Sequence, residues 1–330
     1  MGYSIDSIYI DSASETEKIT GWLRKEIVHT FKKRGAVVGV SGGVDSSVVI
    51  SLCARALGPE HVIGVMMPEK ESSPQSAELA VKLMNKLGVK YVSEDMSDSL
   101  TGIGCYRRRD EAIKRLFPEY TKGYKAKILL PENDTENPLN IFSLVIIAPD
   151  GSEKSVRLPL KEYLQVVAAS NFKQRSRMSM LYYHAESRNY AVAGTANKNE
   201  HEQGFFVKYG DGGADIKPIV HLYKTQVYQL AAHLGVSEEI CLRIPTTDTY
   251  SAEQTQEEFF FREPFEILDR IWFGWENGVP AVEIASVLKI PLKRVESIIG
   301  DIQRKIKTTE YLRSLPLSMK SEVREEYICY

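Results

Sequence analysis

Residues 41–47, with the sequence SGGVDSS, carry the residue types that bind phosphate. They follow a short apolar run, 36–40, that is typical of a buried parallel strand, and they precede an apolar run, 48–57, that indicates a helix. Glycines let the backbone approach an anion, and the free N–H groups at a helix N-terminus point at it. The serines add hydroxyl donors, and Asp45 is a candidate to hold magnesium against the phosphates. The stretch therefore predicts a phosphate-binding turn.

The spacing in this turn argues against two common phosphate loops. The chain has no G-x-x-x-x-G-K-[ST] motif of Walker-type NTPases, and no G-x-G-x-x-G follows the strand as in dinucleotide-binding folds. The motif resembles the pyrophosphate loop of ATP pyrophosphatases. That resemblance implies cleavage of ATP between the α and β phosphates and transfer of AMP to a carboxylate or carbonyl oxygen. An ordinary glycine-serine turn is the alternative, and Asp45 with paired serines at a helix start disfavours it.

Two further stretches in the second half carry chemistry. The sequence GTANKNE at 194–200 follows a predicted strand; it offers the Thr195 hydroxyl to a nucleotide and Glu200 as a second oxygen ligand. Two carboxylates plus phosphate oxygens are what magnesium tends to use. The sequence GFFVKYGDGGAD at 204–215 contains four glycines together with Lys208 and Asp215, which favours a ligand-binding loop over a structural turn.

The elements that must position these residues follow an alternating pattern. We expect strands at 36–40, 62–67, 89–92 and 190–194, and helices at 14–33, 45–57, 74–87, 161–187 and 224–234, with 264–312 mostly helical. This rhythm predicts an α/β fold with a doubly wound parallel sheet. The resemblance of the 41–47 motif to ATP pyrophosphatases implies that this sheet is of the adenine nucleotide alpha hydrolase-like type. Its ligand is expected outside the carboxyl ends of the strands, where both motifs fall.

Residues 121–160 break the rhythm with four prolines and three short apolar runs. We interpret about 104–160 as a β-rich insertion in an ATP-pyrophosphatase domain that spans 1–263, with a helical segment, 264–330, in the same domain. Long structureless loops inside compact domains are uncommon. The insertion is therefore expected to form a small β-subdomain beside the active-site mouth, where it shapes the acceptor pocket, or at a subunit contact.

Composition excludes several protein classes. The 330 residues carry 42 Lys and Arg against 44 Asp and Glu, a net charge of −2 that does not suggest a nucleic-acid or membrane binder. The arginines at 107–109 could face an anion, but three arginines on one helical turn are more often a solvated face. Four scattered cysteines without a C-x-x-C argue against a zinc site or a disulfide framework. The polar N-terminus and the absence of an apolar run of ~20 residues favour a cytoplasmic protein.

Six ordered motifs resemble the NAD synthetase family, in its single-domain type without a glutaminase domain. They are SGGVDSS, NFKQRSRM (171–178), GTANKNE, GFFVKYGDGGADIKPI (204–219), LYKTQ (222–226) and IPTTD (244–248). The resemblance implies ATP-dependent amidation of nicotinic acid adenine dinucleotide (deamido-NAD) to NAD with ammonia. The reaction passes through an adenylated carboxylate and releases AMP and pyrophosphate. It also implies a homodimer, and an ammonia supply that is free or comes from a separate protein.

The resemblance also implies roles for individual residues. Magnesium is expected at Asp45 and Glu200, and deamido-NAD at Arg175, Lys208 and Asp215. ATP contacts are expected at Gly39, Val40, Ser41, Gly42, Gly43, Val44, Asp45, Ser46, Thr195, Lys224 and Thr246.

Two other functions stay open at this point. A related amide ligase would adenylate a different carboxylate and use 104–160 and 249–263 to recognise it. A nucleotide-sensing regulator would use 279–305, which resembles a helix-turn-helix with Lys293 and Arg294 at the start of its recognition helix, to contact DNA. The lack of a basic domain disfavours the regulator.

Overall fold

The computed structural model describes residues 2–129, 142–246, 250–252 and 254–319. Residues 130–141 of the expected insertion, Thr247 and Asp248 of the IPTTD stretch, Cys329 and the rest of 320–330 lie outside this part of the chain. Within it, a four-stranded parallel sheet has the order β3-β2-β1-β7. The strands are β1 (Ala36–Gly39), β2 (Val62–Met66), β3 (Lys90–Ser93) and β7 (Ala191–Ala193). The α/β class and the parallel sheet expected from the sequence are confirmed.

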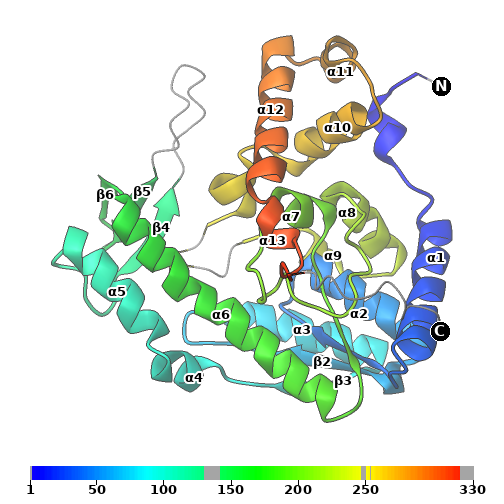
Figure 1. Cartoon of the computed structure of the whole chain (residues 1–330), viewed down its shortest axis with the longest axis horizontal. Coiled ribbons are helices and arrows are strands. Elements are labelled where there is room, and N and C mark those ends of the chain that lie inside the picture. The colour runs from blue at the N-terminus through cyan, green and yellow to red at the C-terminus, as the bar shows by residue number, and fades with distance from the viewer. Residues whose placement is uncertain (1, 130–141, 247–249, 253, 320–330) are drawn as a thin grey trace.

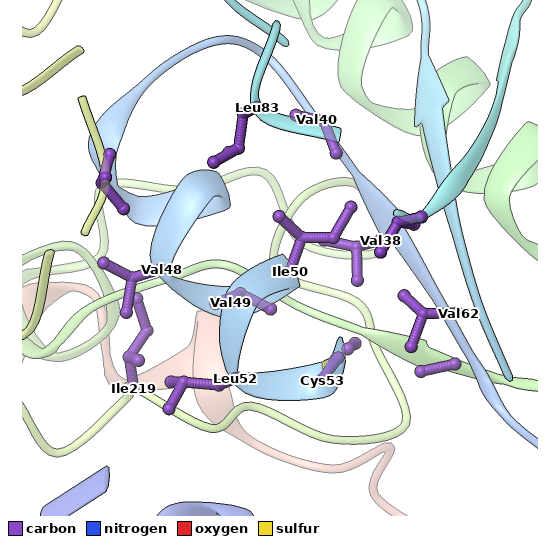
Figure 2. Close-up of a cluster of buried hydrophobic side chains, with 14 of the residues drawn as sticks. Val38, Val40, Val48, Val49, Ile50, Leu52, Cys53, Val62, Leu83 and Ile219 are labelled. Carbon is purple, nitrogen blue, oxygen red and sulfur yellow. The ribbon is translucent and has the colours of Figure 1, made fainter. Parts of the chain in front are cut away.

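Helices cover both faces of the sheet. Because successive strand residues point to opposite sides, neighbouring residues of β1 pack against different helices. Val38 of β1 belongs to a cluster with α1 (Ser12–Arg24), α2 (Val44–Leu57), α3 (Pro74–Leu87) and α8 (Lys224–His233), part of which Figure 2 shows. Its neighbour Val37 belongs to a second cluster on the other face, with Met178, Leu181 and Ala185 of α6 (Leu160–Glu186). Both valines are fully buried, which stabilises the fold by roughly 1.5–3 kcal/mol for each side chain.

The insertion forms a separate antiparallel sheet of three strands, β4 (Lys125–Leu129), β5 (Ser143–Ile147) and β6 (Glu153–Arg157), in the order β4-β5-β6. It lies beside the N-terminal part of α6 in Figure 1. The expectation of a β-rich segment from about 104 was wrong for its first part, because α5 (Cys105–Leu116) is helical and packs on α6. The hydrophobic spacing within α5 lets one face of that helix reach the core, which a β-rich reading overlooked.

The C-terminal helices α10 (Phe265–Glu276), α11 (Ala281–Leu288) and α12 (Leu292–Thr308) share a third apolar cluster. Tyr223, at the start of α8, and Ile8 also belong to it, so this cluster joins the helices to the α/β core. The segment that resembles a helix-turn-helix is therefore packed as part of the same body, and Arg294 pairs with Glu263 at 2.6 Å. The division at residue 263 stays a prediction.

The N-terminal helix, which the sequence predicts at 14–33, begins at Ser12 as α1 and continues into a π-helical turn, Lys25–Thr30. Within the described residues, no helix is both long and apolar enough to cross a bilayer. The other elements are 3₁₀ turns at Ile5–Ile8 and Pro59–His61, a π-helical turn at Glu257–Phe261, and helices α4 (Ser97–Gly102), α7 (Lys198–Gln203), α9 (Glu238–Cys241) and α13 (Glu310–Arg313).

Candidate active site

The predicted phosphate loop, 41–47, lies between β1 and the first turn of α2, as the pattern of strand and helix indicates, and its phosphate-binding role stays a prediction. Gly42 has φ +78°, and a Cβ there would lie 2.3 Å from the carbonyl oxygen of Ser76, so this position requires glycine. Two serine hydroxyls donate to the carbonyl oxygen of Gly43, Ser46 at 3.0 Å and Ser47 at 2.8 Å. These bonds fix the turn so that the first N–H groups of α2 are presented at the end of the strand.

Asp45 lies at the centre of a polar cluster formed by three elements. Its Oδ1 accepts a hydrogen bond of 2.9 Å from Asn197 Nδ2, and its Oδ2 accepts one from Lys224 Nζ. Asn197 is also the N-cap of α7, where its Oδ1 accepts from the N–H of Glu200 at 3.0 Å. Burial lowers the pKa of the Lys224 amine, but the charges of Asp45 and Glu200 outweigh it, so that pKa lies above its ordinary value. Lys224 is therefore a buried, charged lysine.

Glu200 shares the charge environment of Asp45. Burial and the Asp45 charge raise the pKa of Glu200 to about 8, against the opposing effect of Lys224. Two carboxylates that repel each other at one cavity wall form the donor set that a hard cation prefers. No group of three or more Asp, Glu, His or Cys in the described ranges forms a metal site by itself. The pair therefore fits a magnesium ion that takes its remaining ligands from phosphate oxygens and water.

A cavity of about 790 Å³ opens at the carboxyl ends of the strands and gathers most of the predicted residues. Gly42 and Asp215 are not among its lining residues. The predicted residues that line it are Gly39, Val40, Ser41, Gly43, Val44, Asp45, Ser46, Arg175, Thr195, Glu200, Lys208, Lys224 and Thr246.

The three residues expected to bind deamido-NAD have different surroundings. Arg175 Nε donates to the carbonyl oxygen of Lys208 at 3.2 Å, which links α6 to the glycine-rich loop. Lys208 Nζ donates to the carbonyl oxygens of Tyr311 at 2.6 Å and Ser314 at 3.0 Å. The carboxylate of Asp215 accepts from the Tyr182 hydroxyl at 3.0 Å and from a backbone N–H of β7 at 2.8 Å. The substrate role of Asp215 stays a prediction, and here its carboxylate holds the loop to the sheet.

The sequence missed a buried ion network beside the cavity. Arg109 was expected on a solvated face, but it is 4% exposed and binds both carboxylate oxygens of Glu71 at 2.8 Å. Lys173, 1% exposed, pairs with Glu71 at 2.7 Å and with Glu69 at 2.9 Å, and the Tyr106 hydroxyl donates to Glu69 at 2.7 Å. The network fixes the loop after β2, part of which lines the cavity.

A second missed feature is a wall of aromatic side chains. Tyr163 of α6, Tyr250, Phe205 and Phe259 all line the cavity. The Tyr250 and Phe259 rings meet edge to face with centroids 5.6 Å apart, and the Phe205 and Phe259 centroids lie 6.0 Å apart. These residues come from four separate segments and share no local motif. The sequence signals were the aromatic richness of the stretch at 259–261 and the place of Phe205 in the glycine-rich motif.

Comparison with known families decides where this arrangement belongs. The model of the family described as NAD synthase matches residues 15–113 and 146–316. The chain belongs to the NAD synthase family. The family model leaves 114–145 unmatched, a stretch that includes β4 and the start of β5.

Curated relatives give the same answer over nearly the whole chain. A protein of Mesorhizobium japonicum named NH(3)-dependent NAD(+) synthetase is 45% identical over 317 residues, which cover 96% of this chain and 99% of the relative. A protein of Rhizobium meliloti with the same name is 46% identical over 314 residues, covering 95% and 94%.

Solved structures support the fold. An NMN synthetase from Francisella tularensis has a TM-score of 0.65 at 22% identity, covering 94% of this chain and all of that one. The NH3-dependent NAD synthetase from Campylobacter jejuni has a TM-score of 0.60 at 22% identity, with the same coverage. At these identities the likeness concerns the fold of the NAD synthase family alone.

Proposed function

We propose that this protein is a ligase that amidates deamido-NAD to NAD with ammonia, at the expense of ATP. The observation that carries the proposal is the convergence of the phosphate loop, Lys224, the Asp45–Glu200 pair and Arg175 on one cavity. Family membership and the names of the relatives support the same reaction.

The phosphate loop would hold ATP, with the Ser41 hydroxyl and the N–H groups at the start of α2 directed at its phosphates. The acid's carboxylate attacks the α-phosphorus, and pyrophosphate leaves with increased negative charge. Lys224, held by Asp45 in the cavity wall, supplies a fixed positive charge where that charge develops. Thr195 and Thr246, which also line the cavity, would contact the nucleotide.

Magnesium, when bound at Asp45 and Glu200, would neutralise charge on the phosphate oxygens. Binding a cation there would also favour the charged form of Glu200, against the burial and the Asp45 charge that raise its pKa. The carboxylates of Asp45 and Glu200 are suitable ligands for this cofactor, and neither side chain contributes apolar packing to the fold.

Arg175 and Lys208 would hold the dinucleotide at the other part of the cavity. An arginine can bind a phosphate or a pyridine carboxylate through two N–H groups at once. Ammonia then attacks the adenylated carbonyl carbon, AMP leaves, and the amide forms. These steps need no covalent bond between substrate and enzyme, because pyrophosphate leaves from ATP and AMP leaves from the adenylate.

We also propose a cytoplasmic homodimer. Among the described cysteines, Cys53, Cys105 and Cys241 are unpaired, which suits a reducing compartment. The family resemblance supports the dimer, and light scattering on the purified protein would measure the oligomeric state.

A turnover assay tests the function. The purified protein receives ATP, magnesium, ammonium and deamido-NAD, and products are identified by mass. We expect NAD, AMP and pyrophosphate in equal amounts, and no NAD when glutamine replaces ammonium. Amide formation only with another carboxylic acid would replace deamido-NAD as the substrate, and selective DNA binding without turnover would support the regulator. NAD formation from glutamine by the chain alone would overturn the ammonia dependence.

A further inference from the structure

Strand β4 is an edge strand, yet its outer side is occupied. The backbone N–H of Ala126 donates to Ser251 Oγ at 2.9 Å, and its carbonyl oxygen accepts from the N–H of Ala252 at 3.2 Å. The carbonyl oxygen of Ile128 accepts from Gln254 Nε2 at 2.8 Å. Edge strands present unpaired N–H and C=O groups, and here these groups bind a segment more than 120 residues away in the chain.

The bound segment carries a wall of the cavity. Tyr250 directly precedes Ser251, is 7% exposed, lines the cavity, and meets the ring of Phe259 edge to face. Phe259 in turn lies next to Phe205 of the glycine-rich loop. A shift of the segment along β4 would therefore move the Tyr250 ring, which contacts Phe259.

The insertion also reaches the wall by a second route. Phe142, just before β5, stacks on Tyr163 with centroids 4.5 Å apart and the rings 18° from parallel. Tyr163 lines the same cavity from α6. The rings of Phe142, Tyr163, Tyr250 and Phe259 pack in or against one apolar cluster with the inward residues of β4 and β5: Ala126, Ile128, Leu144 and Ile146. The sheet thus forms one packed unit with three of the four wall rings, distinct from the cluster under the phosphate loop, whereas Phe205 packs against the cluster of the C-terminal helices.

We propose that the three-stranded sheet is a specificity element, in which the edge of β4 positions Tyr250 and Phe142 positions Tyr163 so that the aromatic wall fits the planar acid of the acceptor. The inference rests on the proposed function, because it assigns this wall to the carboxylic acid and not to ATP. Aromatic faces suit a flat heteroaromatic ring, which stacks on them in offset or edge-to-face geometry. Since β4 lies in the stretch that the family model does not match, the support is an addition to the matched core.

Point variants test the proposal without deleting the sheet. Ser251→Ala removes the side-chain acceptor for the Ala126 N–H, and Phe142→Ala removes the ring stacked on Tyr163. Ser155→Ala is the matched control for the serine, because Ser155 is exposed on β6 of the same sheet. Each protein is assayed for the Michaelis constants of deamido-NAD and ATP, for deamido-NAD affinity by calorimetry, and for its melting temperature.

We expect Phe142→Ala to raise the Michaelis constant for deamido-NAD by about 2- to 12-fold, the range that an aromatic pair supports. Ser251→Ala should change it in the same direction, with the ATP constant within about twofold of wild type and Ser155→Ala like wild type. Calorimetry should show the same loss without turnover. The ratio of catalytic efficiencies for deamido-NAD and nicotinic acid mononucleotide should stay unchanged, because both carry the same planar acid. A rise in the deamido-NAD constant without a rise in the ATP constant is what a general loss of stability would not produce.

The outcomes separate the two proposals. If wild type forms no NAD from deamido-NAD, the proposed function fails and this inference falls with it. If wild type is active and both variants behave like Ser155→Ala, only the inference fails. Equal changes in the Michaelis constants for ATP and deamido-NAD would also overturn the inference, because the wall would then not act on the acid selectively. If Phe142→Ala does not fold, the milder Ser251→Ala decides alone.

Discussion

Replacing Lys173 with methionine is expected to destabilise the protein and to weaken ATP binding. Lys173 is 1% exposed and pairs with two carboxylates, those of Glu69 and Glu71. Methionine preserves most of the volume but removes the charge. The loop that carries both glutamates then loses one of the side chains that fix it, and this loop continues into Ser72 and Ser73 in the cavity lining.

The size of the effect follows from the network. Removing one partner of a buried ion pair costs roughly 3–5 kcal/mol. Arg109 still binds Glu71, and Tyr106 still donates to Glu69, so we expect about 3 kcal/mol, the low end of that range. For 330 residues the entropy of unfolding is about 0.7 kcal/mol/K, which converts this loss to a melting temperature lower by ~4 °C.

The loss should also depend on pH. Burial raises the pKa of Glu71, but Arg109 and Lys173 outweigh it and lower that pKa from 4.5 to about 2. A carboxyl with a lowered pKa in the folded state stabilises the protein above its unfolded pKa, and this contribution is lost as pH falls from 4.5 towards 2. Without Lys173 the pKa of Glu71 rises, so the variant's deficit should be largest near neutral pH and smaller at pH 4.

Melting curves at pH 7, 5 and 4, with ATP titrations at pH 7, measure these effects. Lys82→Met is the control, because Lys82 pairs with Glu239 at 3.0 Å while both side chains are more than 60% exposed. That pair should contribute less than about 1 kcal/mol. A Lys173→Met protein that melts like Lys82→Met at every pH would refute the stabilising role. An unchanged Michaelis constant for ATP in a destabilised variant would refute the link to the cavity.

Two further predictions concern the phosphate end of the cavity. Asp45→Asn and Glu200→Gln should each lower pyrophosphate release by at least about 100-fold at saturating magnesium while circular dichroism stays unchanged, since both carboxylates are expected to hold the cation; near-normal release in either would remove the metal site. Gly42→Ala should lower the melting temperature more than Gly43→Ala, because Gly42 has φ +78° and no room for a Cβ, whereas Gly43 has φ −93° and its nearest neighbour at 3.4 Å. Equal melting temperatures would contradict the steric argument.

The sequence predicted the residues at the strand ends because topology brings them together. β1 pairs with β7 in parallel, so the segments after the two strands, which carry Asp45 and Glu200, leave the sheet side by side. Alternation of strands and helices was enough to expect this. The hydrogen bonds by which Asn197 links Asp45 to Glu200 were not expected. Asn197 with Glu200 three residues later is nevertheless a recognisable capping box.

Side chains that meet across distant segments were harder to predict. Arginines 107–109 are consecutive on a helix, so they point in directions about 100° apart and only one can face the core. Arg107 and Arg108 are exposed, as expected of a solvated face, but Arg109 is buried. Its partner Glu71 lies 38 residues earlier, in a loop with no periodic pattern. Local spacing shows that one arginine could turn inward, but not that an acid is there to meet it.

The aromatic wall shows the same limit more strongly. The apolar runs around 121–160 correctly indicated three strands, yet the pattern of a strand describes only where its side chains point. The contacts that carry Tyr250 to the cavity use the backbone N–H and C=O groups on the outer edge of β4, which are chemically the same at every residue except proline. The sheet that carries this edge packs on α5 and α6, whose Ile113 and Val166 share its core with Tyr250, and no local pattern shows which segment the edge binds. Recognition of the acid can therefore depend on residues that never touch it, which is why the Phe142 and Ser251 variants, and not a search of the sequence, are needed to test the role of the insertion.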